Sequence, residues 1–371
     1  MISYWEREAL SQYDLVVIGG GIVGNFTALE YAKAHPNAKI AILERGFFPE
    51  GASTKNAGFA CFGSIAELEH DLETLGPEQT VALIMQRFEG LQKLRNTLGD
   101  EAIGYEEFGG FEICFESPNL DRIEFFNDLL EPALGARPYS WVSAEGFGFS
   151  EKVIGLIKNA LEGTIHTGKM MDALQQKVSA TGIRYFTQSP VSRIEDGPSG
   201  KTVHVQSLNG TIALEARQVA LCTNAFTKDF LPELDLNPGR GMIVITKPHP
   251  SFDWKGSFHY HEGYHYFRTI DGRLLLGGGR QLDLKGETTT EPGINTTIEA
   301  QLLKDIQDFI APGVSLEIDQ KWSGVMAFGA NKQPVVQRID PHMVAGVRLG
   351  GMGVAIGASV GAAAAELLER S

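Results

Sequence analysis

Three glycines spaced as Gly19-x-Gly21-x-x-Gly24 constrain the fold of this 371-residue chain more than any other feature. They come directly after a short β-branched run at residues 15–18 and open a segment of helical character. A second apolar run, residues 40–43, follows that segment. This order predicts a strand, a tight turn, a helix and a second parallel strand, which together form a βαβ unit.

Each glycine of this motif has a distinct physical role in a nucleotide-binding loop. Gly19 permits the tight turn, Gly21 lets a pyrophosphate approach the backbone, and Gly24 allows the helix to pack closely on the strand. The start of the helix, at Ile22 and Val23, supplies N–H donors and a positive dipole end for phosphates. An ordinary glycine-rich turn is the alternative, but the flanking strands and helix favour a dinucleotide.

Glu44 and the residues after it bear on which dinucleotide is bound. Glu44 stands twenty residues beyond Gly24, where a carboxylate accepts hydrogen bonds from a ribose hydroxyl and disfavours a 2′-phosphate. The fingerprint itself fits both FAD and NAD. After Arg45, residues 51–59 form a run of small and hydrogen-bonding side chains that can wrap a large flat cofactor, which favours FAD.

Composition excludes several other classes of protein. The chain is 43% hydrophobic and 21% charged, as a packed globular protein is, and its net charge of −14 argues against a nucleic-acid partner. Cys61, Cys114 and Cys222 lie too far apart for a metal or disulfide framework, so we expect no metal site. We find no secretory signal and no membrane span, so the expected location is cytoplasmic; composition specifies no oligomeric state.

Beyond the first unit, strands and helices cease to alternate. Residues 77–98 and 120–134 have a helical period, whereas residues 242–279 contain successive strands, with a hairpin turn at Asp271-Gly272. We predict an α/β fold with a Rossmann-type FAD-binding domain and a second, α+β substrate domain built on an antiparallel sheet. The predicted boundaries are 1–85, 151–235 and 323–371 for the FAD-binding domain and 86–150 and 236–322 for the substrate domain.

Six segments, taken in order, resemble the D-amino-acid oxidase-like family of FAD enzymes, which includes glycine oxidase, sarcosine oxidase and the gamma-glutamylputrescine oxidases. They are residues 16–24, 43–45, 51–58, 271–278, 322–324 and 350–354, and they span nearly the whole chain. The resemblance implies oxidation of the C–N bond of a small amine or amino acid by hydride transfer to flavin N5. Water then hydrolyses the imine product.

The resemblance also implies which residues hold the cofactor. Glu44 and Arg45 should hold the adenosine end, and Val191 should meet the adenine through its backbone. The flavin side should be lined by Ser53, Thr54, Asn56, Ala57 and Gly58, the pyrophosphate should pass Thr223, and the pyrimidine edge should lie against Gly351, Met352, Gly353 and Val354. Helix packing is an alternative reason for the last glycines. No cysteine occupies the place where sarcosine oxidases attach their flavin, so we expect non-covalent FAD.

Tyr264, Tyr266 and Arg268 alternate along one predicted strand, so they should share a face, which we interpret as the substrate face. The resemblance implies that Tyr264 helps to hold a substrate carboxylate. Core tyrosines and a structural arginine are the alternative. Related amino-acid oxidases carry an arginine where this chain has Met326, and Gly351 replaces another, so a larger or less acidic amine is favoured.

Two other functions stay open from the sequence. A flavin dehydrogenase would pass electrons to a quinone or carrier instead of O2, and a non-catalytic FAD-binding protein would not need an aromatic and arginine strand. Hydride transfer requires no acid–base residue, so His166, His259 and His261 are candidates only by residue type. Cys61 is expected to be a small buried residue rather than a nucleophile.

Overall fold

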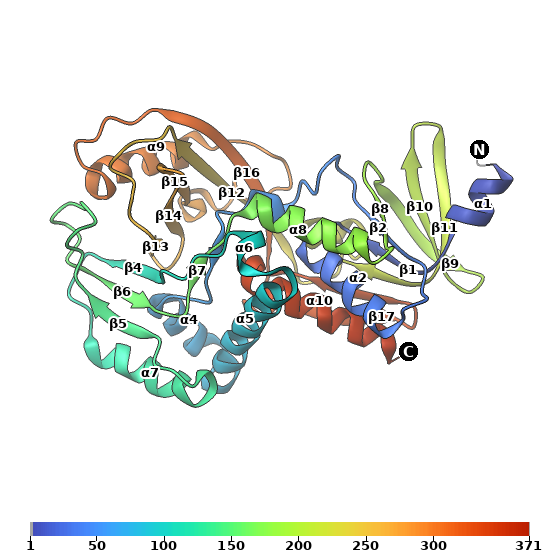
Figure 1. Cartoon of the computed structure of the whole chain (residues 1–371), viewed down its shortest axis with the longest axis horizontal. Coiled ribbons are helices and arrows are strands. Elements are labelled where there is room, and N and C mark those ends of the chain that lie inside the picture. The colour runs from blue at the N-terminus through green and yellow to red at the C-terminus, as the bar shows by residue number, and fades with distance from the viewer. Residues whose placement is uncertain (1–2, 371) are drawn as a thin grey trace.

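Two eight-stranded sheets form the framework of the computed structural model, which describes residues 3–370 (Figure 1). The first sheet has a parallel centre in which β8 (Arg184–Phe186), β2 (Ile40–Leu43), β1 (Gln12–Ile18), β11 (Gly210–Leu221) and β18 (Met343–Val347) are neighbours in that order. Antiparallel strands complete it, with β17 (Val335–Asp340) beside β18, β10 (Gly200–Ser207) beside β11, and β9 (Val191–Gly197) beside β10. The predicted βαβ unit is present as β1, α2 (Ile22–Ala34) and β2.

The second sheet is antiparallel except where β13 meets β4. Its strands are, in spatial order, β16 (Ile318–Phe328), β12 (Asn237–Thr246), β15 (Arg273–Gly278), β14 (His265–Ile270), β13 (Ser257–Tyr260), β4 (Gly110–Cys114), β6 (Gly155–Asn159) and β5 (Tyr139–Val142). One face buries stacked aromatic rings, among them Phe258, whose centroid lies 5.0 Å from those of Phe111 and Phe267. The predicted fold class is confirmed, and the exact domain boundaries stay a prediction.

Helices fill the space beside and between the sheets. They are α1 (Tyr4–Leu10), α3 (Ala52–Lys55), α4 (Ile65–Leu75), α5 (Pro77–Leu98), α6 (Asp100–Ile103), α7 (Leu120–Leu134), α8 (Thr167–Ala180), α9 (Thr296–Asp305) and α10 (Gly353–Glu369), besides α2. Short 3-10 turns cover Asn224–Asp229 and Arg280–Asp283, a π-helical turn covers Ile306–Ile310, and β3 (Phe59–Ala60) pairs with β7 (Gly163–Thr164). The helices expected at residues 77–98 and 120–134 coincide with α5 and α7.

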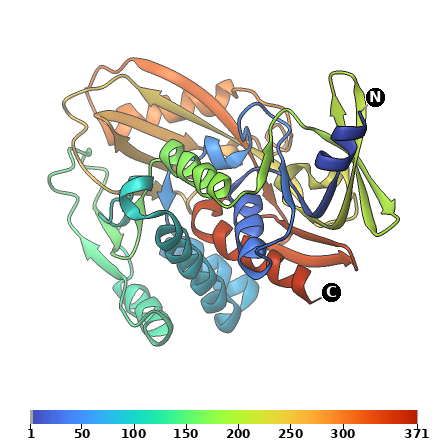
Figure 2. The ribbon, with the colours of Figure 1, turned by 45° about the vertical axis from the view of Figure 1, so that its right-hand side comes forward.

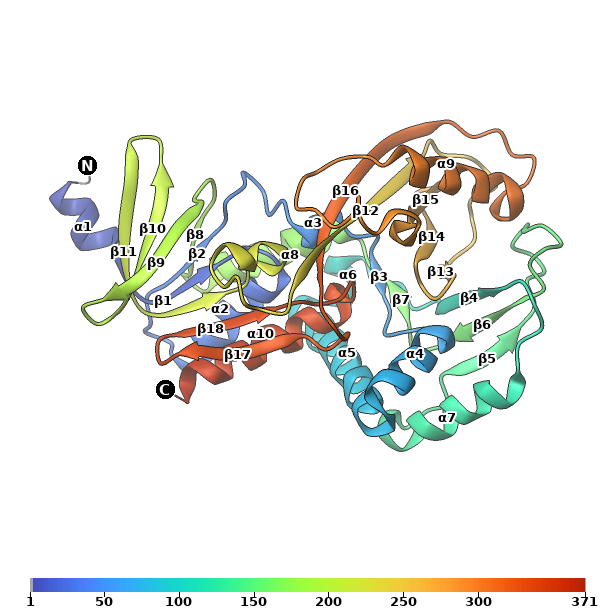
Figure 3. The same cartoon turned by 180° about the vertical axis from the view of Figure 1, so that it is seen from behind.

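Helix α10 packs closely on α2 and α5, and the three run side by side in Figure 2. A Cβ on Gly361 would lie 2.6 Å from Phe26 Cβ, and one on Gly90 would lie 2.3 Å from the carbonyl oxygen of Ala355. Such distances leave no room for a side chain. This packing places the start of α10 at the junction of the two sheets, where β12 and β16 also arrive (Figure 3).

Within residues 3–370, no helix combines the length and the apolar character needed to cross a membrane.

Candidate active site

A cavity of about 730 Å³ lies between the two sheets. At one end it is bounded by the carboxyl ends of β1 and β2, including Glu44, which is where open α/β sheets bind their ligands. At the other end it is bounded by Tyr264, Tyr266 and Arg280 from the second sheet. The start of α10 lies between these ends, so one continuous space joins a nucleotide end to a substrate end.

The glycine motif has the geometry that the sequence predicts. Gly19 has a φ of +109°, and a Cβ on it would lie 2.5 Å from the carbonyl oxygen of Cys222. Gly24 does not line the cavity, because it packs on the turn itself: a Cβ there would lie 1.9 Å from the carbonyl oxygen of Gly19. Gly21 begins α2 without a side-chain cap, so the helix N-terminus faces the cavity. The Ile22 amide donates to Ser53 Oγ at 3.0 Å.

Glu44 and Arg45 both line the nucleotide end. The Glu44 carboxylate is buried and accepts hydrogen bonds from the amides of Gly20 (3.0 Å) and Gly46 (2.9 Å). Burial raises the pKa of Glu44, and the two amide bonds oppose that rise. The Arg45 guanidinium lies 3.5 Å above the ring of Phe226, which holds it flat at the cavity mouth.

The other predicted cofactor residues divide into two groups. Those that line the cavity are Ile22, Val23, Ser53, Asn56, Ala57, Val191, Thr223, Gly351, Met352, Gly353 and Val354. Thr54 and Gly58 do not: the Thr54 hydroxyl donates to the Gly51 carbonyl (3.2 Å), and the Gly58 carbonyl accepts from Arg268 (3.0 Å). These two residues shape the loop, and their contact with a cofactor stays a prediction.

Tyr264 and Tyr266 line the substrate end, but Arg268 does not. The Arg268 side chain is 4% exposed, and its Nη1 donates to the carbonyls of Gly58 (3.0 Å) and Ile165 (2.8 Å). Burial lowers its pKa to about 10. Only Tyr266 and Arg268 lie in β14 and alternate onto one face, whereas Tyr264 precedes the strand, in the turn that joins β13 to β14. The chain around Gly58 and Ile165 covers that face at Arg268.

Arg280 is a cavity residue that sequence reasoning missed. It follows β15 after Gly278 and Gly279, whose φ values of +100° and +78° turn the chain sharply. Its guanidinium lies 3.8 Å above the ring of Phe328, and burial lowers its pKa. Among residues 3–370, no carboxylate lies within ion-pair distance of it. The sequence pattern that could have identified Arg280 is a charged residue directly after a buried strand, here residues 274–279.

Of the three histidines considered, only His259 lines the cavity. His166 caps α8 by accepting from the Lys169 amide (3.2 Å), and His261 lies in the β13–β14 turn with a φ of +51°. His259 is 7% exposed, and its Nδ1 has no hydrogen-bond partner in the described part of the chain. Burial lowers its pKa, so the imidazole is neutral near neutral pH.

Cys61 also lines the cavity, with its Sγ 3.9 Å from Met352 Sδ. Burial raises the pKa of the thiol well above its ordinary value, which keeps it protonated and disfavours a nucleophilic role.

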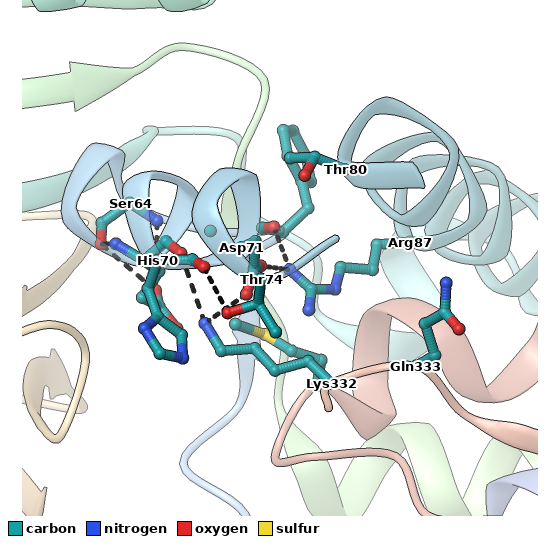
Figure 4. A network of polar contacts seen from close by, with 12 residues as sticks. Ser64, His70, Asp71, Thr74, Thr80, Arg87, Lys332 and Gln333 are labelled. Carbon is teal, nitrogen blue, oxygen red and sulfur yellow. Dashed lines mark hydrogen bonds and ion pairs between the residues drawn. The ribbon is translucent and has the colours of Figure 1, made fainter. Parts of the chain in front are cut away.

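A network of charged side chains fixes the cavity wall beside α4 (Figure 4). The Asp71 carboxylate is 2% exposed and lies 2.9 Å from Lys332 Nζ and 3.9 Å from Arg87 Nη1. Arg87 also donates to the carbonyl of Phe62 at 2.8 Å. The network therefore ties α4 and α5 to the loop that precedes β17. No group of His, Cys, Asp and Glu side chains within residues 3–370 is arranged to hold a metal ion.

These features fit a bound dinucleotide. The uncapped N-terminus of α2, the glycines that keep side chains away from it, and the acidic group at the end of β2 are the parts such a ligand needs. The residues around Glu44 would hold the adenosine, those at Gly21 the pyrophosphate, and those at Met352 the flavin.

Comparison with known proteins agrees with this geometry. The family model described as FAD dependent oxidoreductase matches residues 14–367. The chain is 22% identical to glycine oxidase of Bacillus subtilis (strain 168), over 88% of this chain and 84% of that protein. It is 23% identical to the mitochondrial L-2-hydroxyglutarate dehydrogenase of Caenorhabditis briggsae, over 90% and 79%.

A solved structure shows the same fold. The crystal structure of glycine oxidase from Geobacillus kaustophilus superposes with a TM-score of 0.78 at 20% identity, covering 97% of this chain and 95% of that one. The family resemblance inferred from the six sequence segments is thereby confirmed. The chain belongs to the family of FAD dependent oxidoreductases, and it is an enzyme that uses FAD as its cofactor.

Proposed function

We propose that this enzyme oxidises the C–N bond of a small amine or amino acid that carries a carboxylate, and that Arg280 holds that carboxylate. The observation that carries the proposal is the Arg280 guanidinium, which faces the cavity without an anionic partner among residues 3–370. The Arg280 side chain is partly buried, and a partly buried positive charge without a counter-ion favours an anionic ligand. The Phe328 ring below the guanidinium leaves the edge of the fork free for a carboxylate.

Arg280 can supply the positive charge that Met326 cannot supply. That residue stands where related amino-acid oxidases carry an arginine, and both it and Phe328 line the same wall of the cavity as Arg280. An arginine from the end of β15 thus replaces one from β16 at the same wall. Tyr264 lies beside Arg280, since its carbonyl accepts from the Gly279 amide (2.8 Å), and its hydroxyl is suited to bind the same carboxylate.

The protein's share of the chemistry is binding, orientation and exclusion of water. When bound, FAD supplies the hydride acceptor for the carbon that carries the nitrogen. Tyr266, whose ring packs edge-to-face on Phe59 at 5.5 Å, and Met326 provide apolar walls around that carbon. The imine product is released to water and hydrolysed.

Oxidation of a 2-hydroxy acid is a second candidate. It is supported by the likeness to L-2-hydroxyglutarate dehydrogenase, and Arg280 would hold the carboxylate in the same way. Such an enzyme would pass electrons to a carrier rather than to O2, as in the dehydrogenase alternative inferred from the sequence.

The test is an anaerobic visible spectrum of the FAD-loaded protein with matched panels of amines, amino acids and 2-hydroxy acids. Bleaching of the flavin band by an amino acid, but not by the amine that lacks its carboxylate, is expected. The Arg280→Met variant should then need about 100-fold more substrate, as loss of a buried charge-assisted bond predicts. Bleaching only by hydroxy acids, or an unchanged requirement in the variant, would overturn the proposal. Admission of air distinguishes an oxidase from a dehydrogenase.

A further inference from the structure

We propose that the substrate end has a second pole, formed by Glu67 and His259, that binds a positively charged group. The preferred substrate would then carry a carboxylate and a cationic group at opposite ends of an extended chain. The carboxylate pole rests on the proposed function of Arg280, whereas the cationic pole rests on separate residues.

Glu67 offers an open carboxylate oxygen to the cavity. It is the third residue of α4, and its Oε2 accepts from the Ser64 amide at 3.1 Å in a capping box. Its Oε1 has no hydrogen-bond partner in the described residues, and the side chain is only partly buried and lines the cavity. Lys332, the nearest lysine, donates to the Glu67 carbonyl (3.4 Å) and pairs with Asp71 instead. The Glu67 carboxylate therefore remains uncompensated.

His259 is the independent observation that points to a ligand here. It faces the cavity, is more than nine-tenths buried, and keeps Nδ1 unpaired within residues 3–370. Across the sheet it stands directly between Glu112 and Tyr266. The Nδ1 atom has no accessible surface, whereas Nε2 has no hydrogen-bond partner within residues 3–370 and keeps some accessible surface, so Nε2 is the atom that a ligand in the cavity would reach. A polar group without a partner is costly, so a ligand that hydrogen-bonds to this imidazole would be stabilised. Because this imidazole is neutral, one of its nitrogens is free to accept from an ammonium group.

The surroundings of this pole carry an excess of acidic groups. Glu112 is partly buried beside His259, and Glu162 is fully buried. Desolvation raises their pKa values to about 7 and about 8, with the Glu67 carboxylate contributing to both rises. Arg87 is the buried cation nearby, and it is already engaged by Asp71 and a carbonyl (Figure 4). The raised pKa keeps Glu162 mainly protonated near neutral pH, so the negative charge that a positive group would meet at this pole is that of Glu67.

The two poles lie on different strands. Arg280 leans over the ring of Phe328, at the end of β16, whereas His259 is on β13. A Cβ on Gly239 of β12 would lie 3.4 Å from Arg280 Nη1, so the guanidinium lies over β12. The sheet order β16-β12-β15-β14-β13 puts three strand spacings, about 14 Å, between β12 and β13. Both side chains line the cavity. The two charged groups of the substrate would therefore be separated by several bonds and would not belong to one α-amino acid head group.

The test measures binding of non-oxidisable probes to the FAD-loaded chain by perturbation of the flavin absorption band. The probes are 6,6-dimethylheptanoate, its isosteric ammonium counterpart 6-amino-6-methylheptanoate, and tert-butylammonium. None has a hydrogen on the carbon that bears, or corresponds to, the nitrogen, so none is consumed. The variants are Glu67→Gln, which preserves the capping box, His259→Phe, and Arg280→Met, with Glu73→Gln as a control for a charge lost elsewhere on α4.

We expect the ammonium counterpart to bind wild type about tenfold more tightly than the dimethyl acid, as one charge-assisted contact predicts. Glu67→Gln and His259→Phe should each reduce this preference and weaken tert-butylammonium, whereas Glu73→Gln should do neither. Equal binding of the two acids by wild type, or a preference that survives both variants, would overturn the cationic pole. If Arg280→Met leaves the binding of the dimethyl acid unchanged, the proposed function fails instead, and the cationic pole stands on the ammonium result.

Discussion

At the nucleotide end of the cavity the polar side chains already have partners in the protein, whereas at the substrate end several have none within the described residues, 3–370. Glu44 accepts two amide bonds, and Asn56 accepts from the Gly58 amide and from Thr167. Arg280 and His259 keep unpaired groups within residues 3–370. The first end is thus preorganised by its own backbone, and the second keeps charged and polar groups available to discriminate between substrates.

The largest effect is expected from a substitution that disrupts the nucleotide end of the cavity and abolishes FAD binding. In Gly24→Val the new Cβ would overlap the Gly19 carbonyl, so α2 cannot pack on β1 and the phosphate-binding turn is lost. We expect a protein that retains no FAD, measured as absence of the visible flavin band after reconstitution. Ala34→Val, at the exposed end of the same helix, is the control and should retain the band. A yellow Gly24→Val protein would show that the close packing is dispensable.

Substitutions of Arg268 and Arg280 test which arginine stabilises the fold and which one binds substrate. Arg268→Met removes donors from two buried carbonyls and should cost about 1–3 kcal/mol of stability, with substrate affinity little changed. Arg280→Met should do the opposite, with a raised KM and an unchanged Tm, because its guanidinium bonds to no described residue. Thermal unfolding and steady-state kinetics of both variants distinguish a role in stability from a role in substrate binding. A raised KM with unchanged Tm in Arg268→Met would restore the substrate role predicted from the sequence.

The carboxylate of Glu162 makes stability depend on pH. Its pKa in the folded protein is raised by burial from 4.5 to about 8, and Arg87 only partly opposes this rise. The folded state therefore binds a proton more tightly than the unfolded state, and stability should fall as pH rises from about 4.5 to about 8. Glu162→Gln should flatten this fall and raise the Tm at pH 8 by a few degrees. A wild-type Tm that climbs over this range would contradict the assignment.

The smallest effect is expected for Tyr264→Phe. Loss of one partly exposed hydroxyl beside Arg280 should raise KM for a carboxylate substrate about threefold to tenfold and leave FAD content unchanged. Steady-state kinetics with the substrate found in the spectral test measure this change. Tyr266→Phe, at a second tyrosine that lines the cavity, is the matched comparison, and an equal effect of both changes would argue that neither hydroxyl contacts the carboxylate specifically.

The nucleotide end could be predicted from the amino-acid sequence because its parts are local. Gly19, Gly21, Gly24 and Glu44 lie within one βαβ unit, whose strand, turn and helix have recognisable patterns over about thirty residues. The helical periods of residues 77–98 and 120–134 were also recognisable, and they coincide with α5 and α7. Together with the order of the six segments, these patterns were enough to predict the fold class, FAD and the family.

The substrate end could not be predicted in this way, because it depends on how distant segments pack together. Glu67, His259 and Arg280 come from a helix, a strand and a turn far apart in the chain, and no periodicity predicts that the order of the second sheet brings them to one cavity. Alternation along β14 predicted which residues share a face with Arg268, but not which segment covers that face. Side-chain direction is a local property of the backbone, whereas burial and pairing depend on what packs above it.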